Sequence, residues 1–246
     1  MPILEAINIT KDYDSRVLHG LNVAIEPGSF VAIMGPSGSG KTTFLHILSG
    51  LDRPTDGTVK VAGEDLTGMK EKDLAALRLR RLGFVFQNPH LLRTLCLLDN
   101  IALPGFLAGD EPREEVVARA RELMESMGIS GLESSDVAEV SGGQLQRASI
   151  CRALINAPEI VIGDEPTGAL NSASAAQVLD IMGEIRARGT TVVLVTHDPM
   201  VAVRADRVLL LADGKITDDV ALGRYSPEAA AERTARVTSL LASRGV

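Results

Sequence analysis

The sequence predicts an α/β fold in which helices pack on a mostly parallel sheet. Short apolar segments typical of strands alternate with helical segments in the outer parts of the chain. A glycine-rich loop joins one of these strands directly to a helix, and a helical stretch without strands interrupts the alternation. We therefore expect one domain over residues 1–226, with an inserted helical subdomain at about 91–152, and a C-terminal helical tail at 227–246.

The first 65 or so residues consist mainly of β-like segments separated by turns. The turn pairs Pro27-Gly28 and Asp56-Gly57 punctuate these segments, which we place at Ile3–Ile9, Leu21–Ile25, Phe30–Met34 and Thr58–Val61. After Met34 a glycine-rich loop leads into a predicted helix, Thr42–Leu48, which Ser49-Gly50 ends.

The later elements follow from the same two periodicities. We expect helices at Glu114–Met127, before the stop at Gly128, and at Ala173–Arg188. Strands are predicted at Leu82–Phe86, Ile160–Gly163 and Thr191–Val195. A hairpin of Val208–Leu211 and Lys215–Thr217 turns at Asp213-Gly214. The tail is predicted to hold one amphipathic helix, Glu228–Leu241.

Composition restricts the class of protein. Of 246 residues, 45% are hydrophobic and 23% charged, which is typical of a globular domain. The formal net charge is −7, so the sequence gives no support to a nucleic-acid partner. Two separated cysteines form no CxxC pair and suit a reducing compartment. Neither a signal peptide nor an apolar run long enough to span a membrane is predicted.

The loop after Phe30–Met34 matches the pattern G-x-x-x-x-G-K-[ST]. Its backbone N–H groups can surround phosphate oxygens, and the following helix adds its N-terminal dipole. Lysine supplies a charge for the β and γ phosphates, and the threonine hydroxyl can bind magnesium. A glycine turn with an incidental lysine is the alternative. The predicted phosphate-binding residues are Gly35, Ser37, Gly38, Ser39, Gly40, Lys41, Thr42 and Thr43.

Two acids follow the apolar segment Ile160–Gly163. Phosphoryl transfer requires a group that holds the metal and a group that orients the attacking water. We predict that Asp164 holds magnesium and that Glu165 polarises the water as general base or orienting group. A helix cap or a loop acid would be the ordinary explanation of such a pair without the phosphate loop.

The segment Ser141-Gly142-Gly143-Gln144 resembles the signature motif of ATP-binding-cassette (ABC) ATPases. Alone it would be a helix-capping turn. In combination with the other motifs, in family order over nearly the whole chain, it implies that family's fold: a RecA-like parallel-sheet core, an N-terminal antiparallel β subdomain and an inserted helical subdomain. The resemblance also implies binding of ATP and Mg²⁺, and a head-to-tail dimer in which residues 141–144 close over the partner's nucleotide.

Further positions match the family one by one. Tyr13 resembles the aromatic residue that stacks on adenine, although a packed strand-end aromatic is the alternative. Gln87 resembles the glutamine that contacts magnesium and responds to the membrane partner. His197 resembles the histidine that contacts the γ-phosphate and orients Glu165, in contrast to a structural hydrogen-bonding histidine. One departure is Asn171, where the family usually has Asp, since Asn cannot carry the charge.

The segment from Asp99 to Pro104 resembles the branch of macrolide-export, lipoprotein-release, cell-division and peptide-resistance ATPases. An ordinary helix start followed by a proline break is the alternative. The resemblance implies a permease with a large extracytoplasmic domain, and a cytoplasmic protein held peripherally on the inner face of the membrane. Competing functions are cell-division signalling, a non-transport ABC ATPase of DNA repair or the ribosome, and a small-molecule P-loop kinase.

Overall fold

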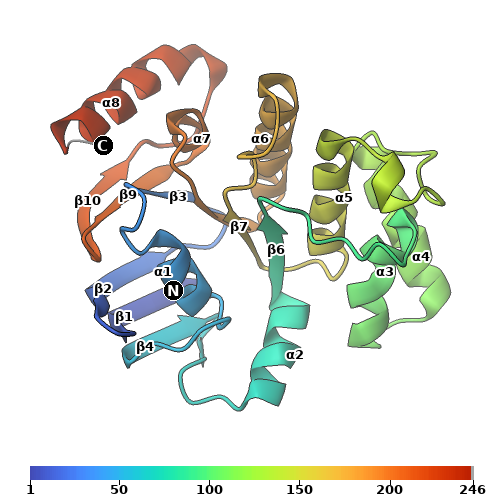
Figure 1. Ribbon diagram of the computed structural model, residues 1–246, viewed down its shortest axis with the longest axis horizontal. Helices are drawn as coiled ribbons and strands as arrows, with labels where there is room; N and C mark the ends of the chain where they lie inside the picture. The colour runs from blue at the N-terminus through green and yellow to red at the C-terminus, as the bar shows by residue number, and fades with distance from the viewer. Residues whose placement is uncertain (245–246) are drawn as a thin grey trace. The chain divides into compact units, whose positions relative to one another are not determined.

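A computed structural model describes residues 1–244 and shows a mixed α/β protein, which confirms the predicted fold class (Figure 1). The chain divides into two compact units. Unit 1 combines Met1–Lys70 with the segment that begins at Ile185, and unit 2 is the intervening Glu71–Glu184.

Unit 1 contains an antiparallel sheet near its N-terminus. The strands are β1 (Leu4–Asp12), β2 (Arg16–Ile25), β4 (Asp56–Val61) and the two-residue β5 (Glu64–Asp65), in the order β2-β1-β4-β5. Leu4 lies opposite both Ile25 and Val61, and all three side chains are fully buried. β1 continues past the predicted end at Ile9 because Thr10, Lys11 and Asp12 still pair with β2, although their polarity breaks the apolar pattern.

The second set of strands in unit 1 contains the buried core. β3 (Phe30–Met34) pairs in parallel with β8 (Thr191–Val195) and with β9 (Arg207–Ala212). β10 (Lys215–Ala221) is antiparallel to β9 across the turn at Asp213-Gly214. Every residue of β3 and β8 is buried, as expected for parallel strands covered on both faces.

The helices of unit 1 differ in how well the sequence predicts them. α1 (Lys41–Leu48) agrees with the prediction. α7 (Pro199–Arg204) was not predicted, although Asp198 caps it and proline occupies its first position. The tail begins with a 3₁₀ turn, η2 (Pro227–Ala229), before α8 (Ala230–Ser243), so the predicted single helix starts slightly too early.

Unit 2 contains a pair of parallel strands, β6 (Leu82–Phe86) and β7 (Ile160–Asp164). α2 (Glu71–Arg81) precedes β6, and α6 (Ser172–Ala187) follows β7 and continues into unit 1. Between β6 and β7 lie α3 (Leu97–Ala108), α4 (Arg113–Ser126), the 3₁₀ turn η1 (Val137–Glu139) and α5 (Gly142–Leu154). α3, α4 and α5 pack against one another. Pro104 lies inside α3, so it does not break that helix.

Among residues 1–244, no helix combines the length and the apolar composition that crossing a membrane requires.

Candidate functional site: a phosphate-binding loop and a signature helix

The phosphate loop connects β3 to α1 in unit 1. Gly35 has φ 151°, and a Cβ atom there would lie 1.9 Å from the carbonyl oxygen of Leu211. Gly40 has φ 99°, and its Cβ would lie 2.7 Å from Leu18 Cδ2. Glycine is therefore required at Gly35 for space and backbone conformation, and it is favoured at Gly40 by the left-handed backbone conformation. The result is a tight turn immediately before the first N–H groups of α1.

Lys41 and Ser39 give the loop its chemistry. The Lys41 ammonium is buried and donates 2.8 Å hydrogen bonds to the carbonyl oxygens of Gly35 and Pro36. These bonds hold the positive charge at the loop. The Ser39 hydroxyl is buried, and within residues 1–244 it has no hydrogen-bond partner. Because an unpaired buried hydroxyl is costly, this one fits a site that a phosphate oxygen completes. Thr42 is exposed in the first turn of α1.

Tyr13 lies in the turn between β1 and β2 and is 59% exposed, which argues against a packed strand-end aromatic. Its hydroxyl donates to Asp52 Oδ2 at 2.7 Å, and this hydrogen bond is the main cause that raises the pKa of Tyr13. Lys11 Nζ lies 4.8 Å from the ring centroid and also donates to Asp52 Oδ1 at 2.7 Å. Thr43 of α1 slightly lowers the pKa of Tyr13, which indicates that the phenol lies near the start of α1. The sequence analysis missed Asp52 and Lys11.

His197 is exposed and lies two residues after Val195, the last residue of β8. Since β8 is parallel to β3, with Val195 opposite Ile33, His197 leaves the sheet at the edge where Gly35 begins the loop. Thr196 fixes the connection, because its N–H donates to the Ile33 carbonyl at 3.1 Å. Within unit 1 the phosphate loop and the histidine-bearing strand end therefore both lie at the carboxyl ends of parallel strands, where ligands bind in such sheets.

In unit 2 the paired strands β6 and β7 bring three predicted residues to one edge. Phe86 lies opposite Asp164, so Gln87 and Glu165 both follow at the same end. Glu165 has φ 49°, a left-handed conformation that is uncommon for residues other than glycine and that occurs often at functional sites. A Cβ on Gly168 would lie 2.8 Å from Gln87 Nε2. The Gln87 amide is therefore packed against the loop that carries Glu165.

Gln146 is a positioning residue that the sequence analysis missed. It lies on α5, is 1% exposed, and its amide nitrogen donates to the Phe86 carbonyl at 3.0 Å and to the Pro166 carbonyl at 2.7 Å. One side chain thus ties the end of β6 to the loop after β7. A glutamine between apolar helix positions is the available sequence signal, but it does not identify the partners.

The signature segment forms the start of α5. Ser141 is the N-cap, and its N–H and its hydroxyl both contact Gln144 Oε1, at 3.1 and 2.7 Å. Gln144 therefore caps the helix. Ser141 and Gly142 are exposed, and a Cβ on Gly143 would lie 2.8 Å from Ser174 Oγ. The first N–H groups of α5 thus lie at an exposed helix start, whereas the Ser141 hydroxyl donates to Gln144.

Comparison with known proteins decides the family. The family described as ABC transporter matches residues 18–168, which is more than half of the chain. The chain belongs to the ABC transporter family. The predicted assignment to the ABC ATPases is thereby confirmed.

Curated relatives of this ABC ATPase domain are longer proteins. It is 44% identical over 219 residues to the macrolide export ATP-binding/permease protein MacB of Salmonella typhimurium, covering 87% of this chain and 34% of that protein. It is 42% identical over 232 residues to the pyoverdine export ATP-binding/permease protein PvdT of Pseudomonas entomophila, covering 92% and 35%. The chain thus spans about a third of the length of these relatives.

Solved structures show the same fold. The ATP-binding cassette MJ0796, in a dimeric post-hydrolysis state bound to ADP and Pi, aligns with a TM-score of 0.83 and 35% identity, covering 90% of this chain and 100% of that one. The protein cbiO1 of Clostridium perfringens aligns with a TM-score of 0.82 over 99% of this chain and 96% of that one, at 24% identity, and supports the fold alone.

The predicted magnesium ligands of this ABC ATPase are chemically suited to the ion. Thr42 offers a hydroxyl, Gln87 an amide oxygen and Asp164 a carboxylate, and Mg²⁺ prefers such hard oxygen donors. Thr42 belongs to unit 1, whereas Gln87 and Asp164 belong to unit 2. The donor set therefore fits magnesium.

Asn171 has a structural role that an aspartate would also fulfil. Its Oδ1 accepts a 2.9 Å hydrogen bond from the Ser174 N–H and caps the start of α6. Asn and Asp are about equally good N-caps, so the departure from the family preserves the helix start and changes only the charge.

Proposed function

We propose that this chain binds and hydrolyses ATP with Mg²⁺, as one half of a head-to-tail dimer that drives a membrane permease. The observation that carries the proposal is the loop from Gly35 to Lys41. A Cβ atom at Gly35 would clash with the backbone, the lysine is held at the loop carbonyls, and the buried Ser39 hydroxyl lacks a partner within the described chain.

Nucleotide binding begins with the triphosphate in this loop. The N–H groups at the start of α1 and the Lys41 ammonium bind phosphate oxygens, and Lys41 exchanges a carbonyl contact for the phosphate as it does so. Tyr13 stacks on the adenine through an exposed ring whose hydroxyl is fixed by Asp52. Ser37, Gly38, Gly40 and Thr43 complete the same contact surface.

Hydrolysis is attack of a water on the γ-phosphorus with loss of ADP. Thr42, Gln87 and Asp164 would hold Mg²⁺, which would supply positive charge to the phosphate oxygens. Glu165 orients the water and accepts its proton, and the strained backbone at this position supports such a role. His197 contacts the γ-phosphate and orients Glu165. Gln146 keeps the loops of Gln87 and Glu165 at a fixed spacing.

A second copy of the chain completes the site. Ser141 and Gly142 are exposed at a helix N-terminus, where a phosphate of the partner's nucleotide can bind. The dimeric state of the MJ0796 structure supports this arrangement. The Ser141 hydroxyl would leave Gln144 and donate to the γ-phosphate, so ATP would bridge the two copies.

The permease partner is proposed from the relatives. The export proteins MacB and PvdT carry an ATP-binding part and a permease in one chain, and this chain matches about a third of each. We therefore propose that it works on a permease with a large extracytoplasmic domain, at the inner face of the membrane, and that export is the activity of the complex. The export relatives favour this function over cell-division signalling.

Replacing Glu165 by Gln tests the proposed function. The amide keeps the shape but cannot accept a proton, so kcat should fall by about 10² to 10⁴-fold. ATP affinity should remain, and light scattering should detect an ATP-dependent dimer. Glu159→Gln is the matched control, because this acid precedes β7 instead of following it and should leave turnover unchanged. Wild-type turnover in Glu165→Gln would show that the catalytic assignment is wrong.

A further inference from the structure

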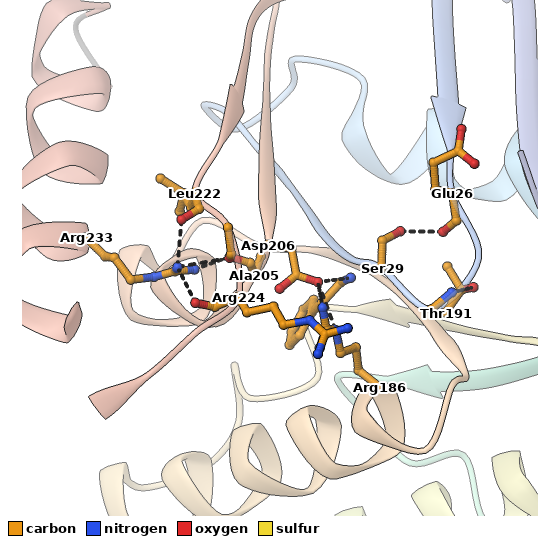
Figure 2. Close-up of polar contacts among 12 residues, drawn as sticks. Glu26, Ser29, Arg186, Thr191, Ala205, Asp206, Leu222, Arg224 and Arg233 are labelled. Carbon is orange, nitrogen blue, oxygen red and sulfur yellow. Dashed lines mark hydrogen bonds and ion pairs between the residues drawn. The ribbon is translucent and has the colours of Figure 1, made fainter. Parts of the chain in front are cut away.

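The tail helix α8 carries a buried arginine. Arg233 is 3% exposed, although the helix lies at the end of the chain. Its guanidinium donates hydrogen bonds to backbone carbonyl oxygens of two segments, which are those of Val203, Ala205, Leu222, Gly223 and Arg224 (Figure 2). Burial lowers the pKa of the guanidinium, and these neutral acceptors compensate for the lost hydration.

The first of these two segments is the C-terminal end of α7. Val203 and Ala205 flank its last residue, and Arg233 Nε lies 2.8 Å from the Val203 oxygen. Carbonyl groups at a helix C-terminus lack partners in the helix and carry its negative dipole end, so a guanidinium is an effective cap there. Tyr225 adds to this contact, because its ring lies over Arg204 at 4.4 Å and over Arg233 at 5.6 Å.

The second segment is fastened to β3. The N–H groups of Leu222 and Gly223 donate to the Asp206 carbonyl at 2.7 and 3.0 Å. The Asp206 carboxylate accepts 2.9 Å hydrogen bonds from the Phe30 N–H and from Arg186 Nε, and Figure 2 shows it facing Arg186. Arg233 therefore joins the end of α7 to a network at the start of the strand that leads into the phosphate loop.

The other end of α7 carries His197. α7 has six residues, and Asp198 caps its N-terminus by accepting from the Met200 N–H at 2.8 Å. Val201, Ala202 and Val203 are buried, so the helix is packed as a unit. In so short a packed helix, a change at the C-terminal carbonyls is transmitted to the residues that precede the N-cap.

We propose that Arg233 is a positioning residue that holds α7, and through it His197, in the orientation that hydrolysis requires; this inference rests on the proposed function. α8 thus acts as a clamp on the histidine segment, and releasing the clamp slows the chemical step. Nucleotide binding through the phosphate loop and Tyr13 does not depend on it.

The first test replaces Arg233 by Met, which keeps much of the side-chain length and removes every donor. We expect kcat to fall by about tenfold or more, because small misplacements of a catalytic group are costly. KM for ATP should stay within about twofold. Arg236→Met is the matched control on the same helix, since Arg236 is exposed and should leave both constants unchanged. Arg233→Lys should be intermediate, because one ammonium cannot reproduce the planar fork.

The second readout is the NMR signal of His197, assigned with a His197→Gln variant. In Arg233→Met, and more weakly in Arg233→Lys, this imidazole signal should shift or broaden. The signals of the other histidines, His19, His46 and His90, should not move. If the Met variant does not fold, the Lys variant supplies the same comparison, with its thermal midpoint recorded.

A folded Arg233→Met protein with wild-type kcat and an unchanged His197 signal would overturn the inference. So would a loss of kcat and a rise of KM without any change at His197. The proposed function fails separately, through wild-type turnover in Glu165→Gln, whereas the His197 signal reports the link from α8 to α7 without reference to turnover.

Discussion

The starts of α1 and α5 are both helix N-termini with glycine at or beside the cap and both suit phosphate, but they differ in the groups that their own unit supplies. The start of α1 has its own positive charge, because the Lys41 ammonium is buried and donates hydrogen bonds to the loop carbonyls. Ser39 is also buried in this loop. At α5 the donors are exposed, and the Ser141 hydroxyl is occupied by Gln144. We therefore infer that the first site binds a triphosphate within one copy of the chain.

The difference indicates that the two helix starts have separate functions. We expect the loop before α1, which has its own cation, to bind nucleotide in a monomer. The start of α5 is neutral and exposed, so we expect it to contribute binding energy only when another copy of the chain brings a phosphate to it. Changes in the phosphate loop should therefore remove binding, and changes at the signature should spare binding and remove dimer-dependent turnover.

Gly35→Ala should have the largest effect. Its Cβ would lie 1.9 Å from the Leu211 carbonyl oxygen, so the loop must move. We expect ATP affinity, measured by calorimetry, to fall by on the order of 100-fold, which corresponds to about 2.7 kcal/mol. Gly38→Ala is the control, because among the described residues nothing lies within 4 Å of its added Cβ. This variant should lose only about 1 kcal/mol of unfolding free energy, because residue 38 has φ 78°, which is unfavourable for a residue with a Cβ atom. Equal affinities for the two variants would contradict the steric argument.

Ser141→Ala should have the next largest effect, confined to the dimer. Monomer affinity for ATP should not change, whereas turnover should fall by about tenfold or more, as expected for one lost hydrogen bond to a charged group. Loss of the N-cap also costs about 1 kcal/mol of stability, which denaturant unfolding would measure. Ser141→Thr retains the hydroxyl and should restore most of the turnover. A weakened monomer affinity in Ser141→Ala would remove the contrast between the two helix starts.

Asp52→Asn should have a smaller effect, at Tyr13, the residue proposed to stack on adenine. Asp52 raises the pKa of Tyr13, so the substitution should lower that pKa. A spectroscopic titration can detect this, because the chain has two tyrosines and no tryptophan. A Tyr13→Phe variant identifies which part of the titration curve belongs to Tyr13. In Asp52→Asn, ATP affinity should fall by about two- to fivefold, because the Tyr13 ring loses its fixed orientation. An unchanged titration would mean that Asp52 does not hold the phenol.

The smallest effect concerns acid stability. Burial raises the pKa of Asp52, but hydrogen bonds from Lys11 and Tyr13 outweigh burial and leave it lowered. A lowered pKa stabilises the folded protein above the unfolded value, about 3.9, and this contribution disappears as pH falls through the folded value. Asp52→Asn should therefore flatten the pH dependence of unfolding free energy below about pH 4. A slope identical to wild type would contradict the assignment.

The sequence predicts those parts of the fold that have a strong local pattern. Phe30–Met34, Leu82–Phe86 and Thr191–Val195 have the predicted bounds because each is an apolar run between breaks. α7 is too short for a period to be detected, and the polar end of β1 hides its length. The loop proposed to bind phosphate is predictable because its chemistry lies within eight consecutive residues.

Residues that act over long sequence separations were not predictable. Asp52 reaches Tyr13 across 39 positions and Lys11 across 41. Gln146 and Arg233 are buried polar side chains whose partners are backbone carbonyls, which no side-chain pattern reveals. Sequence finds the groups proposed to touch nucleotide, and structure finds the groups that hold them.

Hydrogen exchange of the Glu165→Gln protein tests the central claim most directly. Mg-ATP should slow exchange of the amides in residues 37–42 at protein concentrations too low for dimers. It should slow exchange of residues 142–145 only at concentrations where the dimer forms. Protection of both segments in the monomer, or of neither at saturating nucleotide, would contradict this account. In it, the phosphate loop binds ATP in one copy of the chain, and the start of α5 in the second copy completes the site.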